Sequence, residues 1–268
     1  MKNVLSRLTT KKEGDIEVVN VIPEDGNEIY LPQTGDLLDM EKQYRQIMFF
    51  YEAGIQQVTA KLEILNKEFQ YCNDRNPIEN IKSRVKSADS IIEKMKKKGL
   101  PLTISCMMGN IHDIAGVRVI CPFITDVYHV AAMLMNQTDV EVIRVKDYIE
   151  HPKDNGYRSL HVIVMVDVFF SDEKKKVPIE IQFRTIAMNF WASTEHQLRY
   201  KKEEKFTPEM HKQLKRCADL MARADRKMQR LADAAYLSLR HRAMMCGVKF
   251  RAHHTLSVAG HHKSGHRS

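Results

Sequence analysis

The fold is decided by two neighbouring stretches, HPKDNGYRSLH at residues 151–161 and VPIEIQFRT at residues 177–185. In the second stretch, apolar residues stand at every other position with Glu180 and Gln182 between them, and this period of two predicts a β-strand. A carboxylate in an otherwise apolar strand is costly unless a positive partner meets it. The first stretch supplies a flexible basic loop with one aromatic ring, Tyr157, beside a glycine. Together the two stretches indicate a nucleotide site built on a sheet, with the basic loop near phosphates.

Length, charge and cysteine usage narrow the class of protein. The 268 residues allow one large domain with helical extensions, and the hydrophobic fraction of 43% is enough for a core. The net charge of +8 favours anionic partners and leaves nucleotides, RNA and a membrane surface open. Five scattered cysteines without CxxC spacing indicate a reducing cytosol rather than a disulfide framework or a zinc finger. Because we find neither a signal peptide nor a run of 18 apolar residues, we expect a cytoplasmic protein without a membrane span.

Two long helices and two polar ends flank the predicted sheet. Residues 1–36 are polar with several glycines and prolines, and we expect a flexible N-terminal arm there. Apolar residues at alternating steps of four and three predict a helix over 37–72, and a second apolar stripe predicts a helix over 208–245. Each stripe could face the core of its own chain or a second subunit. Residues 246–268 are basic and rich in histidine, and we expect a disordered tail.

Between the long helices, strands alternate with helices. The predicted order is strand, helix, strand, helix and then three strands, which indicates a mixed sheet in an α+β domain. A hairpin turn is expected at 172–176, between the last two strands. We expect strands at 81–85, 117–121, 139–146, 161–170 and 177–183, and helices at 88–98, 124–136 and 185–200.

Two groups of residues in this region suit a polyphosphate and its metal ion. The turn from the first strand into the following helix would aim backbone N–H groups together with Lys86, Ser90 and Lys94 at one point, which fits a triphosphate cradle. A solvated basic face is the plainer interpretation of these residues. Asp113, before the second strand, would on its own more often be a turn residue. Paired with Glu180 from another strand, it matches the two carboxylates that a Mg²⁺ site usually needs.

Six ordered motifs carry a family resemblance: SRVK (83–86), HDIAGVRVICPF (112–123), KDYI (146–149), HPKDNGYRSLH (151–161), VPIEIQFRTIAMNFWAS (177–193) and EHQLRYK (195–201). Together they resemble the synthetase domain of the RelA/SpoT family, and more narrowly the small alarmone synthetases of Gram-positive bacteria, the RelQ-like proteins. The resemblance implies an α+β fold, a nucleotidyltransferase-like mixed β-sheet of about five strands flanked by helices, within one synthetase domain over 37–245. It also implies an enzyme that only synthesises, because the chain has no room for the hydrolase domain of the long family members.

The resemblance further implies a reaction and an assembly. The β,γ-pyrophosphoryl group of ATP would move to the ribose 3′-OH of GDP or GTP, with Mg²⁺ as cofactor and ppGpp or pppGpp and AMP as products. Two polyphosphates held together repel each other, so such a site needs several cations. It must also place the 3′-OH in line with the β-phosphorus. Similar small synthetases are homotetramers joined through their terminal helices, and some bind the alarmone in a central cleft, so the resemblance implies a homotetramer and allows allosteric (p)ppGpp.

The same resemblance implies roles position by position. Arg84 and Arg118 resemble the pair that clamps the adenine by planar stacking. Asp113 and Glu180 match the Mg²⁺ carboxylates, and Glu180 is also the implied base for the 3′-OH. Tyr157 matches the aromatic ring that stacks on guanine. Lys86, Ser90 and Lys94 are implied to contact the ATP phosphates; Lys146, Lys153 and His161 the acceptor phosphates or the transferring group; and Gln182 and Asn189, the latter where many relatives have Asp, are implied to shape the acceptor side.

Two other functions stay open on the residues themselves. A catalytically quiet module that binds nucleotides or single-stranded RNA on the same scaffold would use the positive charge equally well, but it has no need for two metal carboxylates. An ordinary nucleotidyltransferase acting on tRNA or a protein is a third possibility, against which the Tyr157 loop favours a free guanine nucleotide. We therefore expect the pyrophosphokinase.

Overall fold

The computed structural model describes the backbone of residues 8–13, 16–21, 29–32, 34–73, 75–199 and 206–245, and side chains at 41–72, 75–199 and 206–235. By its contacts the chain forms two units, residues 1–225 and residues 226–268. The first unit contains all the strands described below. The described part of the second unit is the C-terminal portion of the last helix. The predicted tail at 246–268 lies outside the described residues.

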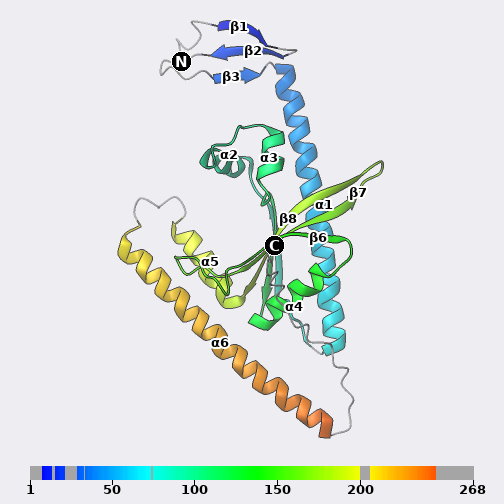
Figure 1. Cartoon of the computed structure of the whole chain (residues 1–268), viewed down its shortest axis with the longest axis vertical. Helices are drawn as coiled ribbons and strands as arrows, with labels where there is room; N and C mark the ends of the chain where they lie inside the picture. The colour runs from blue at the N-terminus through cyan, green and yellow to red at the C-terminus, as the bar shows by residue number, and fades with distance from the viewer. Residues whose placement is uncertain are drawn as a thin grey trace, which may run out of the picture. The chain divides into compact units, whose positions relative to one another are not determined.

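A five-stranded mixed sheet forms the centre of the first unit (Figure 1). Its strands run in the order β4-β5-β8-β7-β6; β5 and β8 pair in parallel, and the other neighbours pair antiparallel. The predicted mixed sheet of an α+β fold is therefore confirmed, with each predicted strand present. The bounds are β4 (Asn80–Val85), β5 (Ala115–Cys121), β6 (Val140–Asp147), β7 (Leu160–Phe169) and β8 (Lys174–Thr185).

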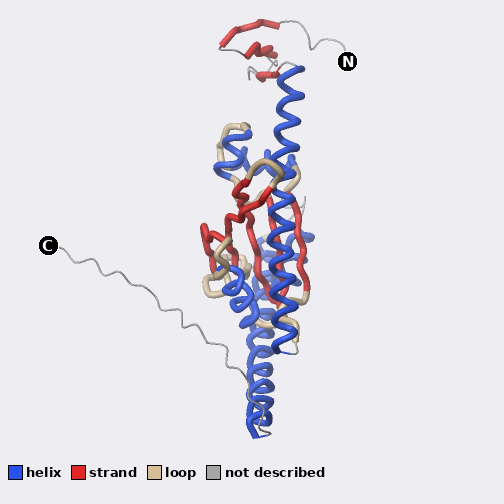
Figure 2. Tube along the Cα trace, turned by 90° about the vertical axis from the view of Figure 1, so that its right-hand side faces the viewer, coloured by secondary structure: helices blue, strands red, loops and turns tan. Residues whose placement is uncertain are grey.

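One face of this sheet is covered by α1 (Thr34–Asn73) and α4 (Ile124–Met135), and Figure 2 shows α1 running along the strands. The apolar stripe of α1 supplies much of the contact, since Tyr51, Ile55, Val58 and Leu62 are at most 8% exposed. Gly54 lets this helix approach β8 closely, because a Cβ at this position would lie 2.9 Å from side-chain atoms of β8. Of the two interpretations open for the α1 stripe, burial within its own chain holds along this stretch.

The remaining predicted helices are present as α2 (Ala88–Lys97), α5 (Ile186–Arg199) and α6 (Pro208–Met245). The apolar stripe predicted on α6 divides into two kinds of surface. Leu214 and Met221 are half-buried, whereas Met228 and Leu231 are more than half exposed. Among the helices that the structure describes, none combines the length and apolar content needed to cross a membrane.

Two parts of the chain differ from the sequence prediction. In the expected flexible arm the structure has three antiparallel strands, β1 (Leu8–Glu13), β2 (Ile16–Val21) and β3 (Ile29–Pro32). The β-branched run in IEVVNV favours a strand, and sequence reasoning missed these three strands. A short helix, α3 (Ile104–Asn110), was also missed; the Thr103 side chain caps it by accepting a hydrogen bond from the Cys106 N–H.

Candidate functional site

The sheet face opposite α1 carries a row of polar side chains. Strand registers place Arg118 on β5, Gln182 on β8, His161 on β7 and Lys146 on β6 next to one another across four strands. Glu180 lies one step along the same face of β8, because side chains alternate between the two faces of a strand. The alternation that predicted this strand therefore also separates the core from the site.

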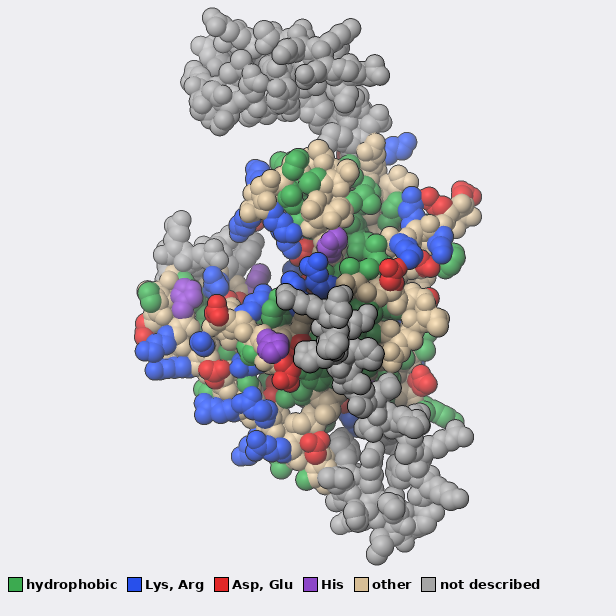
Figure 3. Space-filling view, viewed as in Figure 1, with side chains coloured by type: hydrophobic (Ala, Val, Ile, Leu, Met, Phe, Trp, Pro, Cys, Tyr) green, Lys and Arg blue, Asp and Glu red, His purple; other side chains and the backbone are tan. Residues whose placement is uncertain are grey.

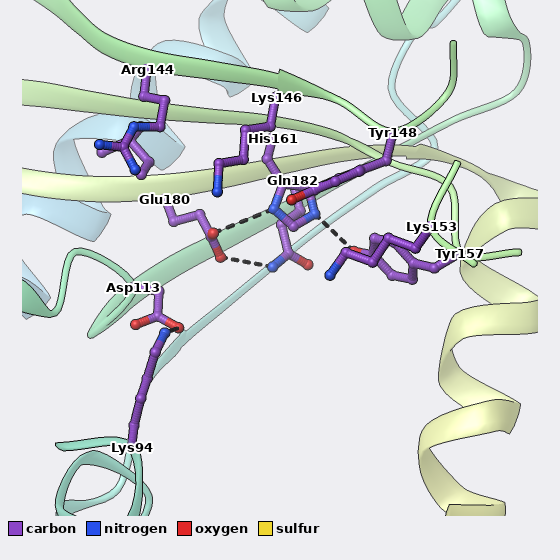
Figure 4. A pocket seen from close by; sticks show the side chains of 11 residues that line it. Lys94, Asp113, Arg144, Lys146, Tyr148, Lys153, Tyr157, His161, Glu180 and Gln182 are labelled. Carbon is purple, nitrogen blue, oxygen red and sulfur yellow. Dashed lines mark hydrogen bonds and ion pairs between the residues drawn. The ribbon is translucent and has the colours of Figure 1, made fainter. Parts of the chain in front are cut away.

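Except for Arg118, these side chains line a pocket of about 370 Å³ (Figure 4). Its lining contains more cations than carboxylates, which suits a polyphosphate. Figure 3 shows blue Lys and Arg side chains over α2 and in the middle of the view below it, as well as elsewhere on this face. The predicted site residues that line the pocket are Lys94, Asp113, Lys146, Lys153, Tyr157, His161, Glu180 and Gln182.

Asp113 is held at the mouth of β5 by two lysines. Its Oδ2 accepts hydrogen bonds from Lys86 Nζ at 2.7 Å and from Lys94 Nζ at 2.5 Å. Burial alone would raise the pKa of Asp113, but these two ammonium groups together lower it below the ordinary value. Its Oδ1 is buried and has no hydrogen-bond partner among the described residues. An ionised carboxylate with one buried, unshared oxygen is a ready ligand for a hard cation.

Glu180 belongs to a closed ring of five side chains. His161 links two of them, since its Nδ1 lies 3.3 Å from Glu180 Oε1 and its Nε2 lies 2.8 Å from Tyr157 Oη. On the other side, Gln182 Nε2 donates to Glu180 Oε2 at 2.8 Å. Arg184 closes the ring, because its Nη2 donates to Tyr157 Oη at 2.7 Å and to Gln182 Oε1 at 2.8 Å. Both oxygens of the Glu180 carboxylate thus have fixed neighbours.

The electrostatics of Glu180 favour the ionised form. Burial pushes the pKa of Glu180 up, and the negative charge of Asp113 adds to this. The hydrogen bonds from His161 and Gln182 contribute in the opposite direction, and the pKa of Glu180 lies below its ordinary value. The site therefore presents two carboxylates that are both ionised at neutral pH.

The loop that carries Tyr157 is fixed on α6. Gly156 has a φ of +90°, and a Cβ there would lie 2.6 Å from Ala218 Cβ of α6. Next to it, Arg158 Nη1 donates to the Ala218 carbonyl at 3.4 Å, and Nη2 contacts Asp219 at 3.3 Å. Lys153 Nζ lies 5.0 Å from the centre of the Tyr157 ring, which places a cation beside the aromatic face.

Five predicted site residues lie outside this pocket lining. Lys86 still reaches the site through Asp113. Arg84 and Arg118 lie on the adjoining strands β4 and β5, where burial and the charges of Arg184 and Arg84 lower the pKa of Arg118 to about 10. The other two residues, Ser90 in the exposed first turn of α2 and Asn189 on α5, are not brought into the lining.

Among the polar residues of the site, sequence reasoning missed Arg144, Tyr148 and Arg184. The period of two offered a way to find two of them, because Arg144 stands two positions before Lys146 and Arg184 two positions after Gln182. Tyr148, in the turn after β6, packs edge-on against the His161 ring of β7 with centroids 5.2 Å apart, a contact that no local pattern encodes.

A basic pocket with two ionised carboxylates, on the open face of a mixed sheet, defines an α+β protein suited to nucleotide polyphosphates. Residues 83–205 match a family model described as a region found in RelA / SpoT proteins. GTP pyrophosphokinase YwaC of Bacillus subtilis (strain 168) is 41% identical over 193 residues, a match that covers 72% of this chain and 92% of that relative. The chain belongs to the RelA/SpoT family, among its small alarmone synthetases.

Solved structures agree with this assignment. Small alarmone synthetase 1 from Bacillus subtilis, bound to its product pppGpp, superimposes with a TM-score of 0.67 at 34% identity, covering 73% of this chain and 99% of that one. A structure of the same protein bound to AMPCPP gives a TM-score of 0.61 at 30% identity and covers 72% of this chain and 97% of that one. The predicted family and fold are both confirmed.

Proposed function

We propose that this chain is a GTP pyrophosphokinase that transfers the β,γ-pyrophosphate of ATP to the ribose 3′-OH of GDP or GTP. The products are AMP and ppGpp or pppGpp. The observation that carries the proposal is the meeting of Asp113, Glu180 and Tyr157 in one pocket lined by an excess of cations. Relatives named GTP pyrophosphokinase, and a neighbouring structure bound to pppGpp, support it.

ATP occupies the β4–β5 side of the site in this proposal. Arg84 and Arg118 lie on neighbouring strands with their charges close enough to affect each other, so an adenine could stack against both guanidinium planes. Lys86 and Lys94 already converge on Asp113 and would meet the phosphates from the same side. Ser90, in the exposed first turn of α2, would contribute to the same phosphate site.

Asp113 and Glu180 would hold Mg²⁺. The buried Oδ1 of Asp113, which has no partner in the described part of the chain, fits a metal ligand, and Glu180 is an ionised carboxylate lining the same pocket. When bound, Mg²⁺ neutralises phosphate charge and polarises the transferring group. Lys86 and Lys94 hold Asp113 in place for this role.

In this proposal the acceptor nucleotide, GDP or GTP, binds on the side of the site that is formed by the loop carrying Tyr157. The ring of Tyr157 stacks on guanine, and Lys146, Lys153 and His161 surround the acceptor phosphates or the transferring group. Glu180 takes the proton from the 3′-OH as the 3′-oxygen bonds to the β-phosphorus. The bond between the β-phosphorus and the oxygen that bridges to the α-phosphorus breaks, and AMP leaves with that oxygen. Gln182 holds Glu180 in place, while the role of Asn189 stays a prediction.

The wider organisation also stays a prediction. It includes the homotetramer, an allosteric site for (p)ppGpp, single-stranded RNA as a partner, and a synthetase domain over 37–245.

Purified protein tests the reaction directly. ATP labelled on the γ-phosphate is incubated with Mg²⁺ and separately with GDP, GTP or GMP, and the products are resolved by chromatography. We expect label in ppGpp or pppGpp and one AMP for each product. Transfer of AMP to an acceptor, with release of pyrophosphate, would instead show a nucleotidyltransferase. Binding of nucleotides without turnover would show the quiet binding module.

A further inference from the structure

We propose that Arg184 is a positioning residue for the acceptor side of the reaction, orienting two hydrogen-bonded arms that both end on Glu180. The inference rests on the proposed function, in which Glu180 is the catalytic carboxylate. It explains why a ring of hydrogen-bonded side chains includes this carboxylate. Arg184 is 4% exposed and lies near the C-terminal end of β8. It is not in the pocket lining, so its action must pass through the residues that it contacts.

One nitrogen of Arg184 controls both arms. Nη2 donates one hydrogen to Tyr157 Oη at 2.7 Å and the other to Gln182 Oε1 at 2.8 Å. A guanidinium group has donors and no acceptor, so the direction of these two hydrogen bonds is certain. Arg184 is therefore the point in the ring from which the hydrogen bonds start.

The short arm runs through Gln182. Because its Oε1 accepts from Arg184, its amide nitrogen must face the other way, and it donates to Glu180 Oε2 at 2.8 Å. Without Arg184 the amide could rotate and present its oxygen to the carboxylate, where two acceptors would repel. The guanidinium thus selects the amide orientation that supports Glu180.

The long arm runs through Tyr157 and His161. Tyr157 Oη accepts from Arg184 and lies 2.8 Å from His161 Nε2, and we assign the proton of Tyr157 to this second hydrogen bond. A neutral imidazole that accepts at Nε2 carries its proton on Nδ1, the atom that faces Glu180 Oε1 at 3.3 Å. Arg184 and Glu180 together therefore select the Nδ1–H tautomer of His161, and the ring that stacks on guanine becomes rigidly linked to the carboxylate that takes the proton.

The tautomer of His161 distinguishes a positioning role of Arg184 from a general role in stability, because a general loss of stability would not change the tautomer. Solid-state ¹⁵N NMR of protein labelled at histidine reports it, with the His161 signal identified by its loss in His161→Asn. We expect Nδ1–H in the wild type and a mixture or Nε2–H in Arg184→Gln. Turnover of Arg184→Gln should fall by about 10–100-fold with little change in the KM for ATP, as for other residues that orient a site ligand. Arg184→Lys keeps the charge and some donors, and should restore part of the loss.

Arg158→Gln is the matched control. Arg158 contacts the same loop and α6 but stands outside the ring, so its loss should leave the His161 tautomer unchanged. If Arg184→Gln does not fold, Tyr157→Phe breaks the same arm and should also disturb the tautomer. A wild-type tautomer in Arg184→Gln, or in Tyr157→Phe, overturns the inference. Failure of the wild type to form ppGpp or pppGpp would overturn the proposed function instead, whatever the tautomer.

Discussion

Gly156 in the Tyr157 loop and Ala218 in α6 lie so close that a Cβ on the glycine would sit 2.6 Å from the alanine Cβ. The φ of Gly156 is +90°, a conformation that L side chains rarely adopt. The loop expected to hold guanine is therefore seated on the helix expected to take part in assembly. Any change that shifts this part of α6 would therefore also shift Tyr157.

Gly156→Ala should weaken acceptor binding. The substitution costs about 1–3 kcal/mol in backbone strain and also forces the loop away from α6. We expect the KM for GDP to rise by roughly tenfold or more while the KM for ATP changes little. Steady-state kinetics with each nucleotide varied in turn measures both values.

Gly99→Ala is a matched control for the backbone strain. Gly99 also has a positive φ, +64°, but a Cβ there would meet nothing within 4 Å. We expect a loss of stability without a rise in the KM for GDP. The double variant Gly156→Ala with Ala218→Gly removes the close contact and should recover part of the acceptor affinity. Equal effects of Gly99→Ala and Gly156→Ala on the KM for GDP would show that the contact between the Tyr157 loop and α6 does not control acceptor binding.

Tyr157→Ala tests the stacking role. Loss of an aromatic partner for a base costs about 1–3 kcal/mol, so the KM for the guanine nucleotide should rise strongly. Tyr157→Phe keeps the ring and should change this KM less, although it loses the hydroxyl that links Arg184 and His161. The assignment fails if the alanine variant loses ATP affinity and keeps GDP affinity.

Glu180→Gln tests the catalytic carboxylate. The amide keeps the shape but loses the negative charge and the ability to take a proton. Turnover should fall by at least ~10²-fold, since general-base and metal effects are each typically that large. Nucleotide binding, measured by calorimetry, should fall much less. Near-full synthesis by this variant would show that Glu180 is not the base.

The sheet and most of the site were predictable from the local sequence. In a strand, apolar and polar residues alternate, and this alternation shows which residues lie on the buried face and which on the open face. Glu180 and Gln182 could be placed on the open face, with the apolar residues between them in the core. The ring through Arg184 was not predictable in this way. It joins residues of β7, of β8 and of the loop before β7. Only the register between the strands brings these residues together.

Other differences between prediction and structure arise because an apolar pattern in the sequence does not show which surface covers it in the folded protein. The apolar stripe of α1 is compatible with a subunit contact, but Ile55 is 8% exposed and packs in the core of its own chain. Ser87 illustrates a second limit. Its side chain accepts a hydrogen bond from the Ser90 N–H and caps α2, a role that sequence reasoning did not assign, while the phosphate contact of Ser90 stays a prediction.

The last prediction concerns assembly through α6. Leu220, Met228 and Leu231 are 51%, 54% and 57% exposed, an apolar surface that a partner helix would cover. In the proposed homotetramer of two-fold symmetry, Leu231→Glu would bury an unpaired charge at a cost of several kcal/mol. Light scattering should then show smaller species that circular dichroism still reports as folded.

Two further variants separate assembly from folding. Arg226→Glu adds an acidic side chain about 140° around the helix from Leu231, at 3.6 residues per turn, and should leave the oligomer intact. Ile55→Glu places a charge in the core beneath α1, so we expect loss of the fold rather than dissociation. A wild-type protein that runs as a monomer at micromolar concentration would contradict the homotetramer. Because the pocket is formed within one chain, that result would leave the proposed reaction unaffected.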